Sequence, residues 1–332
     1  MPLVATRPAR CRHRSARPGI TLIELLIALA ISAFLILGAV RVFGQARAAY
    51  RAQNLINQMQ ENGRYALAAI ESDLRMAGFF GQTAQANRIF GARSALEPIG
   101  LVQQSSDCGR NWSVRLTQPV EGWNRRWMWS CPPRGAPAID ADSFVVRRAS
   151  ANKATTPLDP NTVYIQTNRT GDGRLFLGAG APPLRSGYET YPLRVTGYYV
   201  SDNSVLDLPG RPMPSLRRKI LRGGRLVDEE VMPGVEDMQV QFGVDTNDFG
   251  EIGRGSLNQY INPGDPTGSA TPRIIAVRVW LRIRAAAPER GFTDRQTYRY
   301  ADRQFTPSAN EALYRRMVVT KTIFLRNSRA EG

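Results

Sequence analysis

The longest apolar stretch of the chain lies near its beginning, from Ile20 to Phe43. As a helix that rises about 1.5 Å per residue, it would be about 36 Å long, enough to cross the hydrocarbon core of a bilayer. One carboxylate, Glu24, interrupts it near its start. A carboxylate in hydrocarbon costs about 2.5–3.5 kcal/mol even on a mild insertion scale. The pattern therefore predicts a membrane segment with one acid that needs a partner.

After this stretch the helical pattern becomes apolar on one side only. No proline occurs between Pro18 and Pro98, so nothing in that interval removes a backbone donor from a helix. We expect one helix from about Ile20 to about Ala77, or two helices with a short break near Gly44. Gly78 is a favoured residue for the C-terminal cap. The residues that recur on one helical face are Leu55, Met59, Leu67, Ile70 and Leu74.

The rest of the chain has the pattern of strands. In "RIIAVRVWLRIR" apolar and polar residues alternate, which is typical of a half-buried antiparallel strand. One face holds Ile275, Val277, Val279, Leu281 and Ile283, and the other holds Arg278, Trp280, Arg282 and Arg284. The segments "DSFVVRRA", "LRVTGYYVS" and "MVVTKTIFLRN" are also rich in β-branched and aromatic residues. We expect the α+β class, with long loops between Phe79 and Asp142 and between Ala149 and Leu193.

Five arginines and no acid precede the apolar stretch, within residues 1–19. Such a segment stays in the cytoplasm while the helix behind it inserts, so the bulk of the chain would lie in the periplasm. One interpretation is a signal peptide cut after "ARA" at Ala46–Ala48, which would release a soluble periplasmic binding protein. Against it stand the acid and the length of the stretch, since a signal h-region has about 7–15 residues. A plain single-span anchor is a second interpretation, and Glu24 argues against it.

A third interpretation comes from "GITLIELLIALAI", which resembles the prepilin signature of type IV pilins and type II secretion pseudopilins. The resemblance implies that a prepilin peptidase cuts between Gly19 and Ile20 and methylates Ile20. It also implies that Glu24 pairs with the N-terminal amine of a neighbouring subunit and sets the register of assembly; a buried charge needs such a partner. The first mature residue of the family is commonly Phe rather than Ile.

The prepilin resemblance implies four parts of the chain. Residues 1–19 would be the leader and residues 20–43 the transmembrane or filament-core half of the helix. Residues 44–77 would be its amphipathic half, packed on the antiparallel β-sheet of a pilin-like head at residues 78–332. The protein would be a single-pass inner-membrane protein with a cytoplasmic N-terminus, later moved into a pilus fibre at the cell surface.

Four later segments resemble the PilW family of minor pilins, in the order that the family has. They are "QENGRYALAAIESDLRMAGFFG" at 60–81, "DSFVVRRA" at 142–149, "VMPGVEDMQVQFGVDTND" at 231–248 and "MVVTKTIFLRN" at 317–327. The resemblance implies a protein that primes or caps a type IV pilus and supports twitching motility and adhesion. Its partners would be other minor pilins, the major pilin and the inner-membrane assembly platform. A minor pseudopilin similar to GspJ is the alternative.

Cysteine usage agrees with an oxidising compartment. Cys11 lies in the leader, and the remaining pair, Cys108 and Cys131, predicts a disulfide; two free buried thiols are the alternative. Four tryptophans lie in the loop that the bridge would close: Trp112, Trp123, Trp127 and Trp129. They form either an exposed surface for a partner or a small satellite core, and we favour the core.

Composition argues against catalysis. The only histidine, His13, lies in the leader, so the mature chain has no imidazole for a nucleophile pair or a catalytic zinc site. We interpret the acidic pairs Glu229–Glu230 and Glu236–Asp237 as parts of solvated turns. We expect no cofactor and no metal, since "DTNDFGEIG" at 245–253 does not have the EF-hand spacing. Another calcium geometry is the alternative, with Asp245, Asn247, Asp248 and Glu251.

The chain is basic, with a formal net charge of +16, and removal of the leader takes away five arginines. A basic head outside the cytoplasm would attract DNA or anionic surfaces. The arginines are scattered, however, and we interpret the Arg-rich strand faces as solvated. Nucleic-acid binding is therefore not expected.

Overall fold

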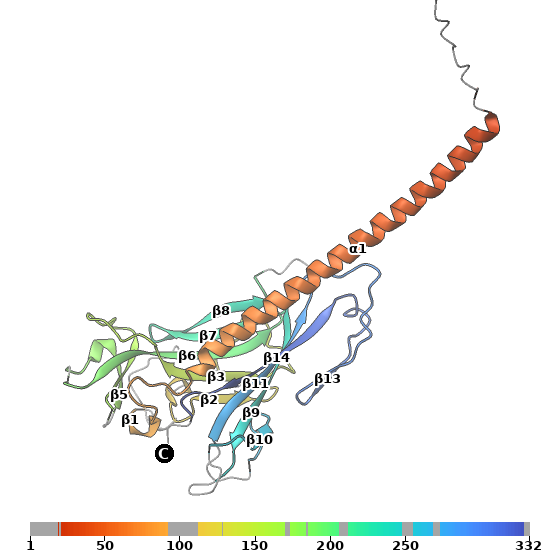
Figure 1. The fold of residues 1–332 in the computed structure, drawn as a ribbon. Coiled ribbons are helices and arrows are strands. Elements are labelled where there is room, and N and C mark those ends of the chain that lie inside the picture. Colours follow the sequence, from red (N-terminus) through yellow and green to blue (C-terminus); the bar gives the residue numbers. More distant parts are fainter. Residues whose placement is uncertain are drawn as a thin grey trace, which may run out of the picture. The chain divides into compact units, whose positions relative to one another are not determined.

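A computed structural model describes residues 19, 21–91, 112–127, 129–169, 173–183, 185–205, 212–247, 255–267 and 273–328 (Figure 1). The chain divides into two compact units, Met1–Gln53 and Asn54–Gly332. The helices are α1 (Leu22–Arg75) and the short 3-10 helices η1 (Ala86–Arg88), η2 (Trp112–Val114) and η3 (Gly178–Gly180). One long apolar helix is thus followed by a β-rich head, which confirms the expected α+β, pilin-like class.

The head contains strands β1 (Ile89–Phe90), β2 (Val120–Trp123), β3 (Ser143–Ala149), β4 (Val163–Thr167), β5 (Gly173–Leu177), β6 (Glu189–Ser201) and β7 (Ser215–Arg222). It continues with β8 (Arg225–Pro233), β9 (Val235–Asp245), β10 (Gln259–Ile261), β11 (Arg273–Arg284), β12 (Tyr298–Tyr300), β13 (Arg303–Phe305) and β14 (Arg316–Phe324).

Helix α1 runs without a break near Gly44, so the single-helix expectation is confirmed. In the part that belongs to the second unit, Met59, Leu67, Ile70 and Leu74 are buried, as their spacing predicts. The helix ends at Arg75, and Gly78 follows with φ +75°, a left-handed conformation that favours glycine.

Two sheets and one hairpin form the head (Figure 1). The larger sheet has the strand order β1-β5-β4-β6-β3-β2. In addition, β7 pairs with the C-terminal part of β6, from Thr196 to Ser201, and β8 pairs with β7. The smaller sheet has the order β10-β9-β11-β14 and is antiparallel. The hairpin β12–β13 pairs with neither sheet. Among the described strands, only β1 and β5 run parallel.

The larger sheet is buried on both faces, which explains why its central strands do not alternate. Phe144 and Val146 of β3 belong to a first core, whereas Val145 between them belongs to a second core. The first core lies between α1 and the two sheets. The second core lies on the opposite face, under the segments at 80–89 and 112–131. Burial of each such side chain contributes about 1.5–3 kcal/mol to the stability of the folded state.

The smaller sheet confirms the predicted faces of "RIIAVRVWLRIR". Ile275, Val277, Val279, Leu281 and Ile283 are all buried. Its arginine face differs from the expectation, because Arg282 is also buried. Arg282 donates from Nε to Glu236 and from Nη1 to the Tyr300 hydroxyl. These two groups take the place of water as hydrogen-bond partners of the guanidinium.

Both predicted loops were wrong, because each interval contains strands. Strands β1 and β2 lie between Phe79 and Asp142. The interval between Ala149 and Leu193 contains β4 and β5, which pair with each other and join the larger sheet through β6. The strands are short, and the residues of β4 are all buried, so they lack the alternation that marks a strand in sequence.

Candidate functional site

The candidate site begins at the first turn of α1, where Thr21 and Glu24 cap the helix. The Thr21 backbone N–H and hydroxyl both donate to Glu24 Oε2, each at 2.9 Å. The Glu24 N–H donates to Thr21 Oγ1 at 3.3 Å. Because the helix begins at Leu22, Thr21 is the N-cap and Glu24 the third helical residue, the arrangement of a capping box. Glu24 is thus held by neutral donors of its own chain, and no ion pair joins it to a cation among the residues that the structure describes.

Sequence reasoning singled out Glu24 but missed Thr21. The Thr-x-x-Glu spacing before an apolar run is itself a signal for a capping box. The other predicted residues of this end are Gly19, which is exposed, and Ile20, which lies outside the described residues. A Cβ atom at Gly19 would meet nothing within 4 Å, so packing within the described chain does not require glycine at this position.

The helix surface that follows is apolar and exposed. Phe34, for example, is 83% exposed and Phe43 is 72% exposed. An apolar surface of this extent, uncovered within its own unit, marks an interaction or membrane site. The helix is long and apolar enough to cross a membrane, by length and composition.

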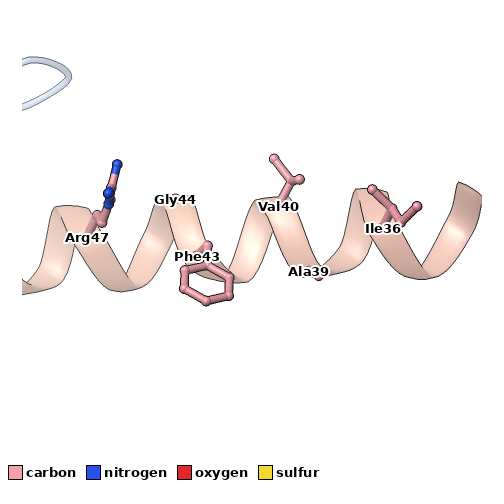
Figure 2. Close-up of a pocket in the computed structure, with 6 residues that line it drawn as sticks. All are labelled: Ile36, Ala39, Val40, Phe43, Gly44 and Arg47. Carbon is pink, nitrogen blue, oxygen red and sulfur yellow. The ribbon is translucent and has the colours of Figure 1, made fainter.

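A shallow groove lies on the last part of this surface (Figure 2). Ile36, Val40, Phe43 and Arg47 line it from successive turns of the helix, as Figure 2 shows. Ala39 and Gly44 line the groove with them and leave it open, because alanine has only a methyl group and glycine has no side chain. The groove therefore combines apolar walls with a guanidinium at one end.

Farther along, α1 is fixed to the head by ion pairs with β3 and β14 and by a hydrogen bond from β6. Arg148 of β3 donates to Asp73 at 2.8 Å, and the Tyr198 hydroxyl of β6 donates to the same carboxylate at 2.9 Å. Burial raises the pKa of Tyr198, and the Asp73 charge raises it further. Lys321 of β14 pairs with Glu71, one turn away from Arg75 of the same network.

Two contacts bring side chains of the head close to the helix backbone at this junction. Gly63 faces β11 and β14, where an added Cβ would lie 2.6 Å from Ile283 Cδ1 and 3.1 Å from Val319. The Asn327 side chain donates to the Ala77 carbonyl just past the helix end, at 3.1 Å. The part of α1 from Asn54 onward is therefore packed against the strands of the head.

The tryptophan loop forms a satellite core, as favoured from the sequence. Trp129 is 4% exposed and lies at its centre. Its ring centroid is 5.5 Å from that of Trp112, which is stacked on it, and 4.7 Å from that of Trp127, which is edge-on. Trp123 contacts it at 6.0 Å. Cys131 is buried in the same core, and Cys108 lies outside the described residues, so their pairing stays a prediction.

Arg147 anchors this loop to β3. It is fully buried and donates to the carbonyls of Trp112 and Gln118, at 2.7 and 2.6 Å. Its remaining nitrogen donates to Glu121 at 2.7 Å. Burial lowers the pKa of Arg147 to about 10, which leaves it protonated at neutral pH. This arginine, like Arg282, contradicts the interpretation of the arginine-rich strand faces as solvated.

The acidic pairs are also not on solvated turns. Glu229 and Glu230 lie in β8, where they face arginines of β7. Glu236 lies in β9 and receives two bonds from Arg316, at 2.8 and 3.0 Å. Asp237 is 2% exposed and accepts from the Tyr300 hydroxyl, and burial raises its pKa. Glu230, Glu236 and Asp237 are partners of buried arginines. The acids around Tyr300 fasten the hairpin β12–β13 to the smaller sheet.

The structure describes two of the four residues proposed for another calcium geometry, Asp245 and Asn247. Asp245 accepts from the Asn247 N–H at 3.0 Å and from the Gly255 N–H, as in a turn that needs no metal. Asp248 and Glu251 lie outside the described residues. Within the described part of the chain, no group of three or more acids, cysteines or histidines is close enough to hold a metal.

Two family models match the chain. The model of type IV pilus-assembly protein W, or PilW, matches residues 197–327, from within β6 to just past β14. That range contains the segments at 231–248 and 317–327, while those at 60–81 and 142–149 lie outside it. The prokaryotic N-terminal methylation motif matches residues 14–40. No match was found among curated proteins or among solved structures.

Proposed function

We propose that the chain is a PilW-like minor pilin that primes or caps a type IV pilus, because the PilW model and the N-terminal methylation motif both match it. The observation that carries the proposal is the continuity of α1. One end of this helix exposes an apolar surface, and the other end is built into the core of the head. One continuous helix therefore joins a segment suited to a filament core to the head of the protein.

We propose that a prepilin peptidase cuts after Gly19 and methylates Ile20, and that the helix then serves as filament core. Glu24 would set the axial register by pairing with the new N-terminal amine of a neighbouring subunit. Thr21 supports this role, because its two donors already orient the carboxylate. A charged amine adds the compensation that neutral donors do not supply.

We further propose that the protein is held in the inner membrane before it enters the fibre. Its partners would be the peptidase, other minor pilins, the major pilin and the assembly platform. Twitching motility and adhesion would follow from pilus assembly. No catalytic step is part of the proposal, since the family acts through subunit association.

Deletion of the gene tests the system to which the protein belongs. The proposal predicts loss of pili and twitching, restored by the wild-type gene, with protein secretion unchanged. Loss of secreted enzymes with normal piliation would instead indicate a minor pseudopilin similar to GspJ.

Complementation with Glu24→Val tests the mechanism. We expect the variant to be processed but excluded from sheared pili, because the register contact is lost. Glu61→Val is the matched control, since Glu61 is an exposed acid of the same helix with only a long ion pair of 4.0 Å to Arg64. Normal incorporation of the Glu24→Val protein would contradict the register role.

A further inference from the structure

A group of arginines lies on two sides of α1 just beyond its apolar span, and neither the family matches nor the proposed function gives it a role. It consists of Arg41, Arg47 and Arg51, which are all exposed. No aspartate or glutamate occurs between Glu24 and Glu61, so the sequence near the band offers no acid to neutralise it. We refer to these three residues as the arginine band.

The position of the band along the helix matches a membrane surface. From Leu22 to Val40 the helix rises about 27 Å, close to the roughly 30 Å of the hydrocarbon core. Arg41 is the next residue, and Arg51 lies about 15 Å farther along the axis. The headgroup layer adds about 5–8 Å on each side of the core, and arginine side chains extend along a helix to reach it. The whole band can therefore contact headgroups.

Around the helix, the band covers two sides. Arg47 and Arg51 are four residues apart and share a face, whereas Arg41 lies about 120° away. Phe43 and Tyr50 are exposed among them, as aromatic residues are at membrane interfaces. Arg47 also closes one end of the apolar groove lined by Ile36 and Val40 (Figure 2). An acyl chain along this groove would bring its own headgroup to the guanidinium.

Leader removal makes the band more important. The precursor has five arginines on one side of the apolar span and the arginine band on the other. A cut after Gly19 removes the five leader arginines. The cations next to the apolar span are then the arginine band and the new N-terminal amine. We propose that the arginine band binds anionic phospholipid headgroups and sets the depth of the processed subunit in the membrane. The proposal rests on the proposed processing at Gly19.

Native mass spectrometry of the membrane-extracted protein tests this. The protein is exchanged into detergent with equal amounts of palmitoyl-oleoyl phosphatidylglycerol and phosphatidylcholine, and the bound lipids are counted. The same spectrum gives the N-terminus, so a failure of processing is separate from a failure of lipid binding. An arginine near an anionic surface changes affinity by about fivefold. We therefore expect a ratio of phosphatidylglycerol to phosphatidylcholine that falls at least about fivefold in the variant R41Q/R47Q/R51Q.

The control variant R64Q/R88Q/R225Q removes the same charge from exposed positions of the other unit. We expect it to keep the wild-type lipid ratio. An unchanged ratio in R41Q/R47Q/R51Q would overturn the proposal, and so would an equal fall in both variants. Loss of piliation in R41Q/R47Q/R51Q with an unchanged lipid ratio would assign the band to a protein partner instead and would also overturn it.

Discussion

The Thr21 hydroxyl lies 2.9 Å from Glu24 Oε2, and this contact fixes the acid of the apolar helix before any second subunit is present. A carboxylate that is already oriented loses less side-chain freedom when it meets a neighbouring amine. The relationship predicts that Thr21 contributes to assembly although it carries no charge.

Replacement of Thr21 tests this contribution. In Thr21→Ala the hydroxyl is lost, and the loss of an N-cap of this kind costs about 0.5–2 kcal/mol of helix stability. We expect less of the variant in sheared pili than of the wild type, with Thr21→Ser close to wild type because serine caps equally well. Quantitative blots of the pilus fraction measure this. Equal incorporation of the alanine and wild-type proteins would show that the cap is dispensable.

Gly63 is predicted to be required for docking of the helix on the smaller sheet. Gly63→Ala places a Cβ atom 2.6 Å from Ile283 Cδ1, and overpacking of this kind costs about 1–3 kcal/mol. Because alanine also favours a helix over glycine, thermal unfolding of the full chain in detergent should occur at a lower temperature than in Gly44→Ala, which has the same gain without the contact. Gly44→Ala is the matched control, because a Cβ there meets nothing within 4 Å and alanine favours a helix. A Gly63→Ala protein as stable as the Gly44→Ala protein would contradict the close packing.

Asp142 is predicted to make the head less stable as pH rises. Burial raises its pKa to about 7, although it accepts from the Val240 and Arg125 N–H groups; Asp237 and Asp302 raise the pKa further. The folded state therefore holds a proton that the unfolded chain releases near pH 4. This contribution is complete below pH 4 and is lost as pH rises to about 7, by a few kcal/mol at most.

Denaturant unfolding at a series of pH values measures this slope. We expect Asp142→Asn to flatten the dependence between pH 4 and 7, because asparagine does not titrate. A slope that is the same in the variant and the wild type would assign the pH dependence to other groups.

The cysteine pair is predicted to be oxidised. Reduction should add two hydrogen atoms to the mass of the mature protein, and Cys131→Ser should lower stability by about 3–4 kcal/mol if the chain-entropy model holds. Cys11→Ser is the control, since the leader is predicted to be removed. Two free thiols in the untreated protein, found by alkylation under denaturing conditions, would contradict the pairing.

Local patterns predicted the helix and the faces of the smaller sheet. The apolar face of α1 and the alternation in β11 repeat over several turns or residues, and Gly78 marks the end of the helix by its own conformational freedom. Thr21 was missed, although the Thr21–Glu24 cap could have been predicted, because its two residues have the three-position spacing of a capping box. These features depend on neighbours in sequence.

The features that could not be predicted depend on distant partners. Arg282 is buried because Glu236 and Tyr300 approach it from other strands, and no local pattern shows which acid meets which arginine. The strand β4 is covered on both sides, so it lacks alternation. The close approach at Gly63 depends on residues more than 200 positions away, Ile283 and Val319.

The mass of the mature protein shows whether the apolar helix is kept after processing. Intact-mass and top-down mass spectrometry of a membrane or sheared-pilus fraction would locate the N-terminus. We predict a chain that begins at Ile20, with one added methyl group, and an uncut precursor in Gly19→Ala. A chain that begins at Ala49 would contradict this prediction, because the apolar half of the helix, with Glu24, would then have been discarded.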